Sequence, residues 1–265
     1  MYNNFQLLFK YFKYYLRASN SKGHGMHSPF VFDFILNVLN NKTGYHSSGA
    51  VENLRVQLLK NKSVLEFKDL GAGSRVNKQK QKTVAQLATS SIKPKKYSQL
   101  LFRLVKHYQP STIIELGTSL GVTTSYLAEA NPSATIITIE GSQAIHEIAK
   151  SNFKQLKLNN ITALTGNFDA MLPSVINQSP LIDLAYVDGN HRYQPTIQYF
   201  HQLLSKVNNN TILVFDDIHW SREMEKAWKE IRSHTDVRCT IDLFFLGFVF
   251  FKNEFKEKQD FEIRF

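Results

Sequence analysis

The chain has 265 residues and a mass of 30.5 kDa, with 43% hydrophobic and 12% aromatic residues. This composition is too apolar for a disordered chain, and 12 glycines and 7 prolines are too few for a fibrous one. The single cysteine, Cys239, excludes an intramolecular disulfide and a zinc site built from several cysteines. The net charge of +10 favours an anionic partner such as nucleic acid, a membrane surface or an anionic ligand.

The positive charge is concentrated in the first third of the chain. Residues 1–96 contain 16 Lys and Arg against 4 Asp and Glu, a net charge of +12. Residues 97–265 contain 16 basic against 18 acidic side chains, a net charge of −2. This asymmetry predicts two units: a basic, mainly helical extension over 1–96, acting as a lid, a dimerisation region or a substrate-recruiting region, and a catalytic domain over 97–265.

The first segment predicts an amphipathic helix. Its apolar side chains recur at helical spacing, at Phe5, Leu8, Phe9, Phe12 and Leu16. We expect this aromatic face to pack on the main domain or on a second subunit of a homodimer; the alternative is an arm that binds a membrane surface or nucleic acid. Because Lys10 and Lys13 interrupt the apolar stretch, no secretory signal or membrane-spanning segment is expected, and the cytoplasm is the expected compartment.

Two other features of the basic third permit a functional interpretation. His24 and His27 have no cysteine or acidic residue close by to complete a metal site, so we interpret them as loop residues. Residues 83–105 contain two helical patterns separated by a short turn, which loosely resembles a helix-turn-helix. The leucines of the second pattern are typical of a core, so nucleic acid is a possible partner but not the favoured one.

From about residue 97, short β-branched runs alternate with helical patterns. The runs are TIIEL (112–116), TIITI (135–139), ITALT (161–165), LIDLAYV (181–187) and TILVFD (211–216). The helical patterns lie near 122–130, 142–155, 193–206 and 221–233. This alternation predicts an α/β fold with a doubly wound, mostly parallel sheet. Residues 237–252 then predict a closing antiparallel hairpin, with a break at Leu246-Gly247.

Two glycine-containing turns follow strand-like runs, at 69–74 and 115–121. A nucleotide-binding loop needs a strand, a tight glycine turn, a following helix, and an acid that ends the next strand roughly 20 residues on. The second turn meets these requirements, because a helical pattern follows it and Glu140 ends the next strand 23 residues after Gly117. The first leads into a basic run with no acid before Glu115, so we interpret it as an ordinary turn.

Several motifs carry a resemblance to a known family. They are E-L-G-T-S-L-G (115–121), I-T-I-E-G-S (137–142), G-N-F (166–168), Y-V-D-G-N-H-R-Y (186–193) and F-D-D-I-H-W (215–220). Over roughly 97–252 the chain resembles the class I S-adenosylmethionine-dependent methyltransferases, and is similar to small-molecule O-methyltransferases with a D-G-x-H-x-Y segment. H-G-M-H-S-P-F (24–30) and G-A-G-S-R (71–75) resemble segments of a Bacteroidetes subgroup. The resemblance implies a seven-stranded, Rossmann-like methyltransferase sheet and a small-molecule acceptor.

The resemblance also implies a set of residues that bind S-adenosylmethionine. Gly117, Thr118, Ser119 and Gly121 would line its methionine moiety, Glu115 would approach its ammonium group, Glu140 would hold the ribose, Asn167 and Phe168 would flank the adenine, and Gly141, Ser142 and Asp188 belong to the same expected set. Acids and aromatic rings suit this ligand because its sulfonium and ammonium groups are cationic. The alternative for Glu140 is an acid that only caps a helix.

Acidic residues end the next two predicted strands. Asp188 follows the run at 181–187, Asp216 ends the run at 211–216, and Asp217 follows it. In metal-dependent relatives such as catechol O-methyltransferase, an Asp at the first place and Asp-Asn at the second bind Mg²⁺. Here the second pair is Asp-Asp, so the sequence leaves two alternatives open: Mg²⁺ or another divalent cation on the three carboxylates, or a proton shared among them.

Two histidines are the candidate bases. His191 follows Asp188 by three residues, at the place where metal-dependent relatives carry a catalytic Lys, and it could accept a hydroxyl proton near neutral pH. His219 follows the Asp pair and is the second candidate. Tyr193 and Trp220 are the expected aromatic wall of the acceptor pocket.

Two other functions compete with small-molecule O-methylation. The first is a nucleic-acid methyltransferase that uses the basic third and acts on ribose 2′-hydroxyls. Base methylation is disfavoured, because Asp188-Gly189 is not the Asn/Asp-Pro-Pro-aromatic motif of amination sites and Cys239 is not placed as a cytosine nucleophile. The second is a non-enzymatic binding protein on the same fold.

Overall fold

The computed structural model describes residues 1–20, 28–41, 49–68 and 79–265. His24, His27 and the glycine turn at 69–74 lie outside these residues. The helices are α1 (Asn4–Arg17), α2 (Pro29–Phe34), the π-helical turn η1 (Ile35–Leu39), α3 (Gly49–Lys60), α4 (Val84–Ser91), α5 (Lys95–Tyr108), α6 (Val122–Ala130), α7 (Gln143–Gln155), α8 (Phe168–Gln178), α9 (Tyr193–Leu204) and α10 (Arg222–Ser233).

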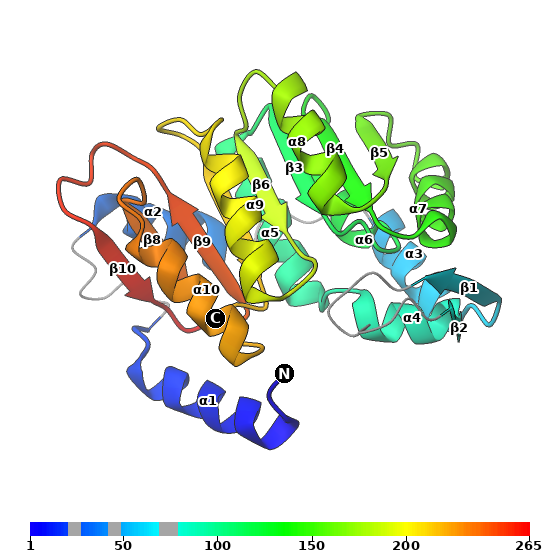
Figure 1. Ribbon diagram of the computed structural model, residues 1–265, viewed down its shortest axis with the longest axis horizontal. Coiled ribbons are helices and arrows are strands. Elements are labelled where there is room, and N and C mark those ends of the chain that lie inside the picture. The colour runs from blue at the N-terminus through cyan, green and yellow to red at the C-terminus, as the bar shows by residue number, and fades with distance from the viewer. Residues whose placement is uncertain (21–27, 42–48, 69–78) are drawn as a thin grey trace.

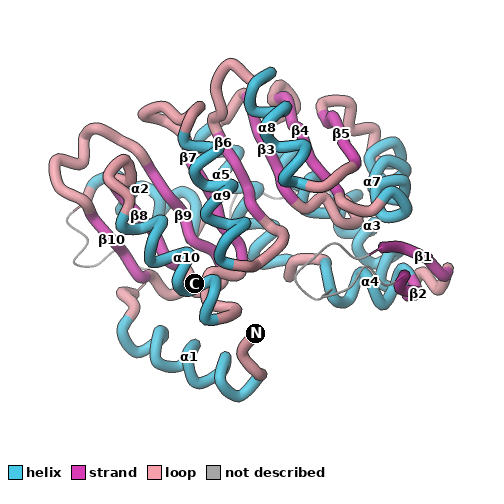
Figure 2. The backbone as a smooth tube through the Cα atoms, in the orientation of Figure 1, coloured by secondary structure: helices cyan, strands magenta, loops and turns pink. Residues whose placement is uncertain are grey.

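The strands fall into two sheets. They are β1 (Val64–Lys68), β2 (Gln79–Thr83), β3 (Thr112–Leu116), β4 (Thr135–Glu140), β5 (Ile161–Thr165), β6 (Leu184–Val187), β7 (Ile212–Asp216), β8 (Cys239–Asp242), β9 (Leu246–Phe250) and β10 (Gln259–Glu262). β1 and β2 pair antiparallel as a small separate hairpin, which Figure 2 shows apart from the main sheet.

The main sheet has eight strands in the order β10-β8-β9-β7-β6-β3-β4-β5 (Figure 1). Strands β3 to β7 run parallel to one another, and β9 runs antiparallel to both β7 and β8. The predicted doubly wound, mostly parallel sheet with a closing antiparallel pair is therefore confirmed. The expected number of seven strands was one too low, because β10 adds beside β8. This edge strand reads QDFE, too short and polar to give a strand pattern.

The predicted break at Leu246-Gly247 was wrong, because both residues lie inside β9 and the chain turns at 243–245. Gly247 instead makes room for a side chain of α10. A Cβ atom at this position would lie 2.6 Å from the indole ring of Trp228 on α10, so only glycine lets that ring pack flat on the strand.

Helices cover both faces of the main sheet. α8, α9 and α10 lie on one face, and α5 and α6 lie on the other (Figure 1). The cluster of buried side chains on the α5 face also includes residues of the basic third, among them Val31, Phe34, Val38, Leu54 and Leu58. The first third therefore shares a core with the sheet. The domain boundary between residues 96 and 97 stays a prediction, and α5 runs across it from Lys95.

α5 is the helix that a helix-turn-helix would place in a DNA groove. It buries Ser98 and every residue from Leu100 to Val105. A helix committed to the core in this way has no face left to enter a major groove. The packing therefore disfavours the helix-turn-helix interpretation.

α1 packs beside the C-terminal strands with the face opposite to the expected one. Tyr14 is buried, donates its hydroxyl to the carbonyl of Ile263, and packs against Phe244 with ring centroids 5.3 Å apart. The Phe side chains point outward, with Phe5 78% and Phe9 64% exposed. The prediction that this aromatic face packs on the main domain was wrong, because tyrosine supplies a hydroxyl donor for backbone carbonyls that phenylalanine lacks. Among the described residues, no helix is long and apolar enough to cross a membrane.

Candidate functional site

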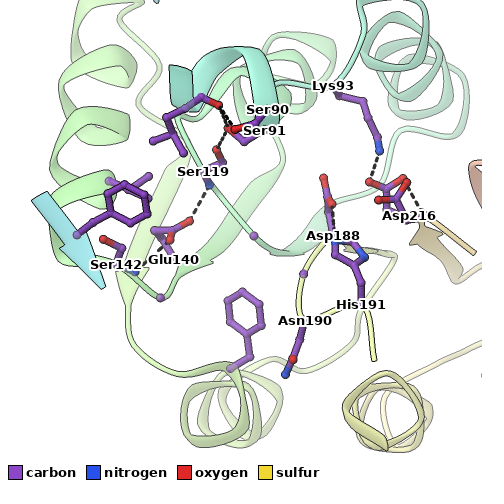
Figure 3. A pocket seen from close by; sticks show the side chains of 18 of the residues that line it. Ser90, Ser91, Lys93, Ser119, Glu140, Ser142, Asp188, Asn190, His191 and Asp216 are labelled. Atoms are coloured by element: carbon purple, nitrogen blue, oxygen red, sulfur yellow. Dashed lines mark hydrogen bonds and ion pairs between the residues drawn. The ribbon is translucent and has the colours of Figure 1, made fainter. Parts of the chain in front are cut away.

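A cavity of about 490 Å³ opens at the carboxyl ends of the parallel strands, the edge where doubly wound sheets bind ligands. Its walls include predicted site residues from five strand ends, namely Gly117, Ser119, Glu140, Gly141, Ser142, Asn167, Phe168, Asp188, His191, Asp216 and Asp217. Figure 3 shows Glu140 and Ser142 at one end of the cavity and Asp188, His191 and Asp216 at the other. The fold therefore brings most of the predicted residues together.

The turn after β3 depends on Gly117. Its φ angle is +106°, and a Cβ atom there would lie 2.0 Å from the carbonyl oxygen of Asp188. The amides of Gly117 and Thr118 donate to the carbonyl of Ile139, at 3.0 and 3.2 Å. The glycine thus lets the loop after β3 touch the loop after β6, so that the two halves of the site share one wall.

Glu140 holds a fixed position at the end of β4. Its Oε2 accepts the amide of Ser119 at 2.8 Å, and its Oε1 accepts the amide of Ser142 at 3.0 Å. Ser142 is the residue that precedes α7, so the carboxylate also supports the start of that helix. Each carboxylate oxygen can accept a second hydrogen bond, so Glu140 combines the capping role with a place on the cavity wall.

Helix α4 of the basic third lies over this end of the cavity. The hydroxyl of Ser119 donates to the hydroxyl of Ser91, at 2.8 Å, and Ser90 and Ser91 both line the cavity (Figure 3). At the end of β5, Asn167 uses its side-chain oxygen to cap α8, at 2.8 Å from the amide of Asp169. The ring of Phe168 remains on the cavity wall.

Three residues of the expected cofactor set do not line the cavity. Thr118 turns its hydroxyl to Thr138, at 2.5 Å, and Gly121 begins α6 against the ring of Phe153. Glu115 is fully buried beneath the loop. Its Oε2 accepts a hydroxyl from Thr138 at 2.7 Å, whereas its Oε1 has no hydrogen-bond partner among the described residues. These three residues therefore contact the protein interior beneath the loop and not the cavity.

Burial raises the pKa of the Glu115 carboxyl to about 8, although hydrogen bonds from Thr124 and Thr138 oppose the shift. The folded protein therefore favours the protonated acid. The stability that this preference contributes is fully present below the unfolded pKa near 4.5 and is lost as the pH rises toward 8.

We expect Glu115→Gln, which mimics the neutral acid, to weaken this pH dependence. Between pH 5 and pH 8, the free energy of unfolding of the variant should rise relative to that of the wild type by about 3 kcal/mol. Urea unfolding of both proteins at the two pH values measures this difference. A constant difference across the range would show that Glu115 is ionised throughout.

Asp188 stands at the centre of the second half of the site. Its Oδ2 accepts the hydroxyl of Tyr186 at 2.9 Å, and its Oδ1 lies 3.5 Å from Nε2 of His191. Both Asp188 and His191 line the cavity and are part exposed to it. The carboxylate can thus orient the imidazole while the other ring nitrogen remains available.

Lys93, which in the sequence is one residue of a basic run, reaches into the same part of the cavity. Its ammonium group forms an ion pair with Oδ2 of Asp216, and the two side chains are 12% and 2% exposed (Figure 3). Burial alone would lower the pKa of Lys93, but the charges of Asp216, Asp188 and Asp217 outweigh it and raise the pKa above its usual range. The lysine is therefore a fixed cation among three carboxylates.

The expected divalent metal does not fit this arrangement. Oδ1 of Asp216 accepts the amide of Asp217 at 2.9 Å, and Oδ2 is taken by Lys93. The two oxygens of Asp188 face Tyr186 and His191. Within the described parts of the chain, no three side chains of His, Cys, Asp or Glu are arranged to hold a metal ion. These carboxylate oxygens are thus engaged by protein groups, and the ammonium group of Lys93 supplies the positive charge that a hard cation would bring.

His219, the second candidate base, is directed away from the cavity. Its Nε2 lies 2.8 Å from Asp242, and its Nδ1 lies 3.4 Å from Glu225. Burial would lower its pKa, but hydrogen bonds with these two acids outweigh that effect and raise the pKa to about 9. His219 therefore joins β8 to α10 as a charged structural group.

The expected aromatic wall also differs. Tyr193 directs its hydroxyl to Glu230 on α10, and neither Tyr193 nor Trp220 lines the cavity. Phe67 of β1, Phe168 and Tyr199 supply aromatic rings to the lining instead.

Residues 114–218, which include the glycine loop, Glu140, Asp188 and Asp216, match the family model described as a methyltransferase domain. This segment of the chain is therefore similar to methyltransferase domains. The matched segment runs from β3 to the loop after β7. It contains the five parallel strands whose ends form the cavity.

Several solved structures with the same fold are bacterial proteins described as O-methyltransferases. An O-methyltransferase from Bacillus cereus in complex with SAH has a TM-score of 0.58 at 18% identity, over 81% of this chain and 96% of that one. A putative O-methyltransferase from Klebsiella pneumoniae has a TM-score of 0.54 at 16% identity, over 62% and 83%. TomG from Streptomyces achromogenes, in complex with SAM, has a TM-score of 0.53 at 18% identity, over 61% and 82%. At these identities the likeness shows a shared fold.

Proposed function

We propose that this methyltransferase domain transfers a methyl group from S-adenosylmethionine to a hydroxyl of a small-molecule acceptor. The observation that supports the proposal is that Glu140 and the Asp188–His191 pair lie at opposite ends of the same cavity (Figure 3). One end suits a ribose and the other suits a hydroxyl that must lose its proton. The O-methyltransferases of the same fold, two of them bound to SAM or SAH, support this choice.

The residues present fit the cofactor. Glu140 has both oxygens fixed by backbone amides and would hold the ribose hydroxyls. Phe168 would lie beside the adenine, and Gly117 and Ser119 would pass along the methionine moiety. When bound, the cofactor supplies an electrophilic methyl group on a sulfonium sulfur.

The acceptor would lie between the cofactor and the Asp188–His191 pair. Asp188, fixed by Tyr186, holds Nε2 of His191, which leaves Nδ1 to accept the hydroxyl proton. His191 would take the hydroxyl proton and so make the acceptor oxygen nucleophilic, and the bound cofactor would supply the methyl group that this oxygen accepts. The protein thus contributes position and proton transfer.

The partners and compartment stay predictions. We propose a small-molecule acceptor, since helix α5 offers no face to DNA. The outward aromatic face of α1 is compatible with the proposed homodimer, in which a second subunit would cover it. The cytoplasm remains the proposed compartment.

A screen of hydroxylated acceptors with methyl-labelled S-adenosylmethionine tests the function. We expect label to be transferred to at least one phenol, catechol or aliphatic alcohol, and transfer to depend on His191. Calorimetric titration with S-adenosylmethionine runs in parallel. A wild-type protein that shows no binding would contradict the proposal, whereas binding with transfer only to RNA would replace the acceptor class.

A further inference from the structure

We propose that Lys93 acts as the built-in cation of the carboxylate cluster, so that this site works without a divalent metal. The inference rests on the proposed function for its role in catalysis. Its structural content, a lysine in place of a metal, can be tested without any acceptor.

The carboxylate cluster needs a compensating positive charge. Three carboxylates, those of Asp188, Asp216 and Asp217, lie at adjoining strand ends on the cavity wall. Burial first, and then the charge of Asp188, raise the pKa of Asp216. Ionised carboxylates here without a cation would therefore destabilise the folded protein. The ammonium group of Lys93 supplies the compensating charge on Asp216 directly.

The backbone of Lys93 is held in place by neighbouring residues. The guanidinium group of Arg55, on α3, donates to the carbonyl of Lys93 at 2.6 Å and to the hydroxyl of Ser98 at 3.2 Å. Pro94 follows at once and begins the turn into α5, which restricts the lysine to an extended backbone. A buried arginine and a proline thus aim one side chain of the basic third into the cavity.

The ammonium group of Lys93 has further hydrogen-bond donors besides the one that pairs with Asp216. It has three donors in all, and the ion pair with Asp216 uses one of them. Lys93 lines the same cavity as Asp188 and His191. A second donor can therefore hydrogen-bond to the acceptor oxygen as its negative charge develops, the role that a metal ion plays in other sites. Lys93 stays protonated throughout and accepts no proton.

Calorimetric titration with Mg²⁺ and Mn²⁺ tests the proposal. We expect the wild type to bind neither ion with a Kd below about 1 mM, since a divalent cation must displace the ammonium group. Lys93→Gln should expose the carboxylates and bind Mn²⁺ at least tenfold more tightly than the wild type. Lys95→Ala is the matched control, because Lys95 lies two residues along, is 55% exposed and pairs with Glu52 instead. It should behave as the wild type.

Two results would overturn the proposal. One is wild-type binding of Mg²⁺ or Mn²⁺ below about 1 mM that Asp216→Asn abolishes, which would make the carboxylates metal ligands. The other is a folded Lys93→Gln that binds neither ion, which would show that the lysine does not occupy a cation site. Binding of S-adenosylmethionine is measured on the same samples, so a failure of the proposed function is seen separately.

Lys93→Gln leaves a buried carboxylate without its partner, and the variant protein can fail to fold for that reason. The double variant Lys93→Gln/Asp216→Asn then decides the matter by circular dichroism. Recovery of the fold in the double variant supports the compensating charge. Failure of both variants shows that the lysine is needed for another reason and overturns the proposal.

Discussion

Replacing His191 by Phe should lower the rate of methyl transfer by a factor on the order of 10²–10⁴, the usual contribution of a positioned general base. The affinity for S-adenosylmethionine should change by less than about threefold, since His191 lies at the acceptor end of the cavity and Glu140 at the other (Figure 3). Single-turnover transfer of labelled methyl measures the rate, and calorimetry measures the affinity.

The matched control is His201→Phe, which changes an exposed histidine on α9 that does not line the cavity. Its rate should equal that of the wild type. Asp188→Asn should reproduce most of the loss, because Asp188 orients the ring of His191. If His191→Phe keeps the wild-type rate while Asp188→Asn loses it, the carboxylate itself is the base.

Glu140→Ala should weaken binding of S-adenosylmethionine by about 100-fold or more. Two hydrogen bonds from ribose hydroxyls to a fixed carboxylate contribute about 1.5–3 kcal/mol each, and roughly 2.7 kcal/mol already corresponds to 100-fold in Kd. The substitution also frees the amides of Ser119 and Ser142, which loosens both walls of this end.

Calorimetric titration of the variant measures the loss. Glu147→Ala serves as control, since Glu147 is an exposed acid on α7 that does not line the cavity. Equal affinities for Glu140→Ala and the wild type would contradict the ribose assignment and reduce Glu140 to a residue that caps α7.

The main sheet was predictable because its signals are local. The β-branched runs that become β3 to β7 alternate with helical patterns, and parallel strands place their carboxyl ends at one edge. Gly117 and Glu140 follow from the same logic, since a turn and the next strand end must meet there. β10 escaped prediction because its four residues, three of them polar, pair only once β8 supplies an edge.

For His191 and His219, sequence spacing alone does not predict which side chain faces the cavity. Each follows a strand-end acid by two or three residues, yet only His191 faces the cavity. After β7, Asp217 adopts a φ angle of +54° and donates its amide to the carbonyl of Phe245. This turn directs His219 toward Asp242 and Glu225. Residues distant in the sequence decided its role.

The sequence by itself determined a basic first third of +12, a nearly neutral remainder, and a glycine turn followed by a helix and a strand that ends in an acid. It did not determine what the positive charge does at the site. The tertiary structure decided that, because α3 and α5 must pack on the sheet before Arg55 can hold Lys93 against Asp216. Among the described residues of the basic third, Lys93 pairs with the acidic cluster in the cavity, and only long-range packing could place it there.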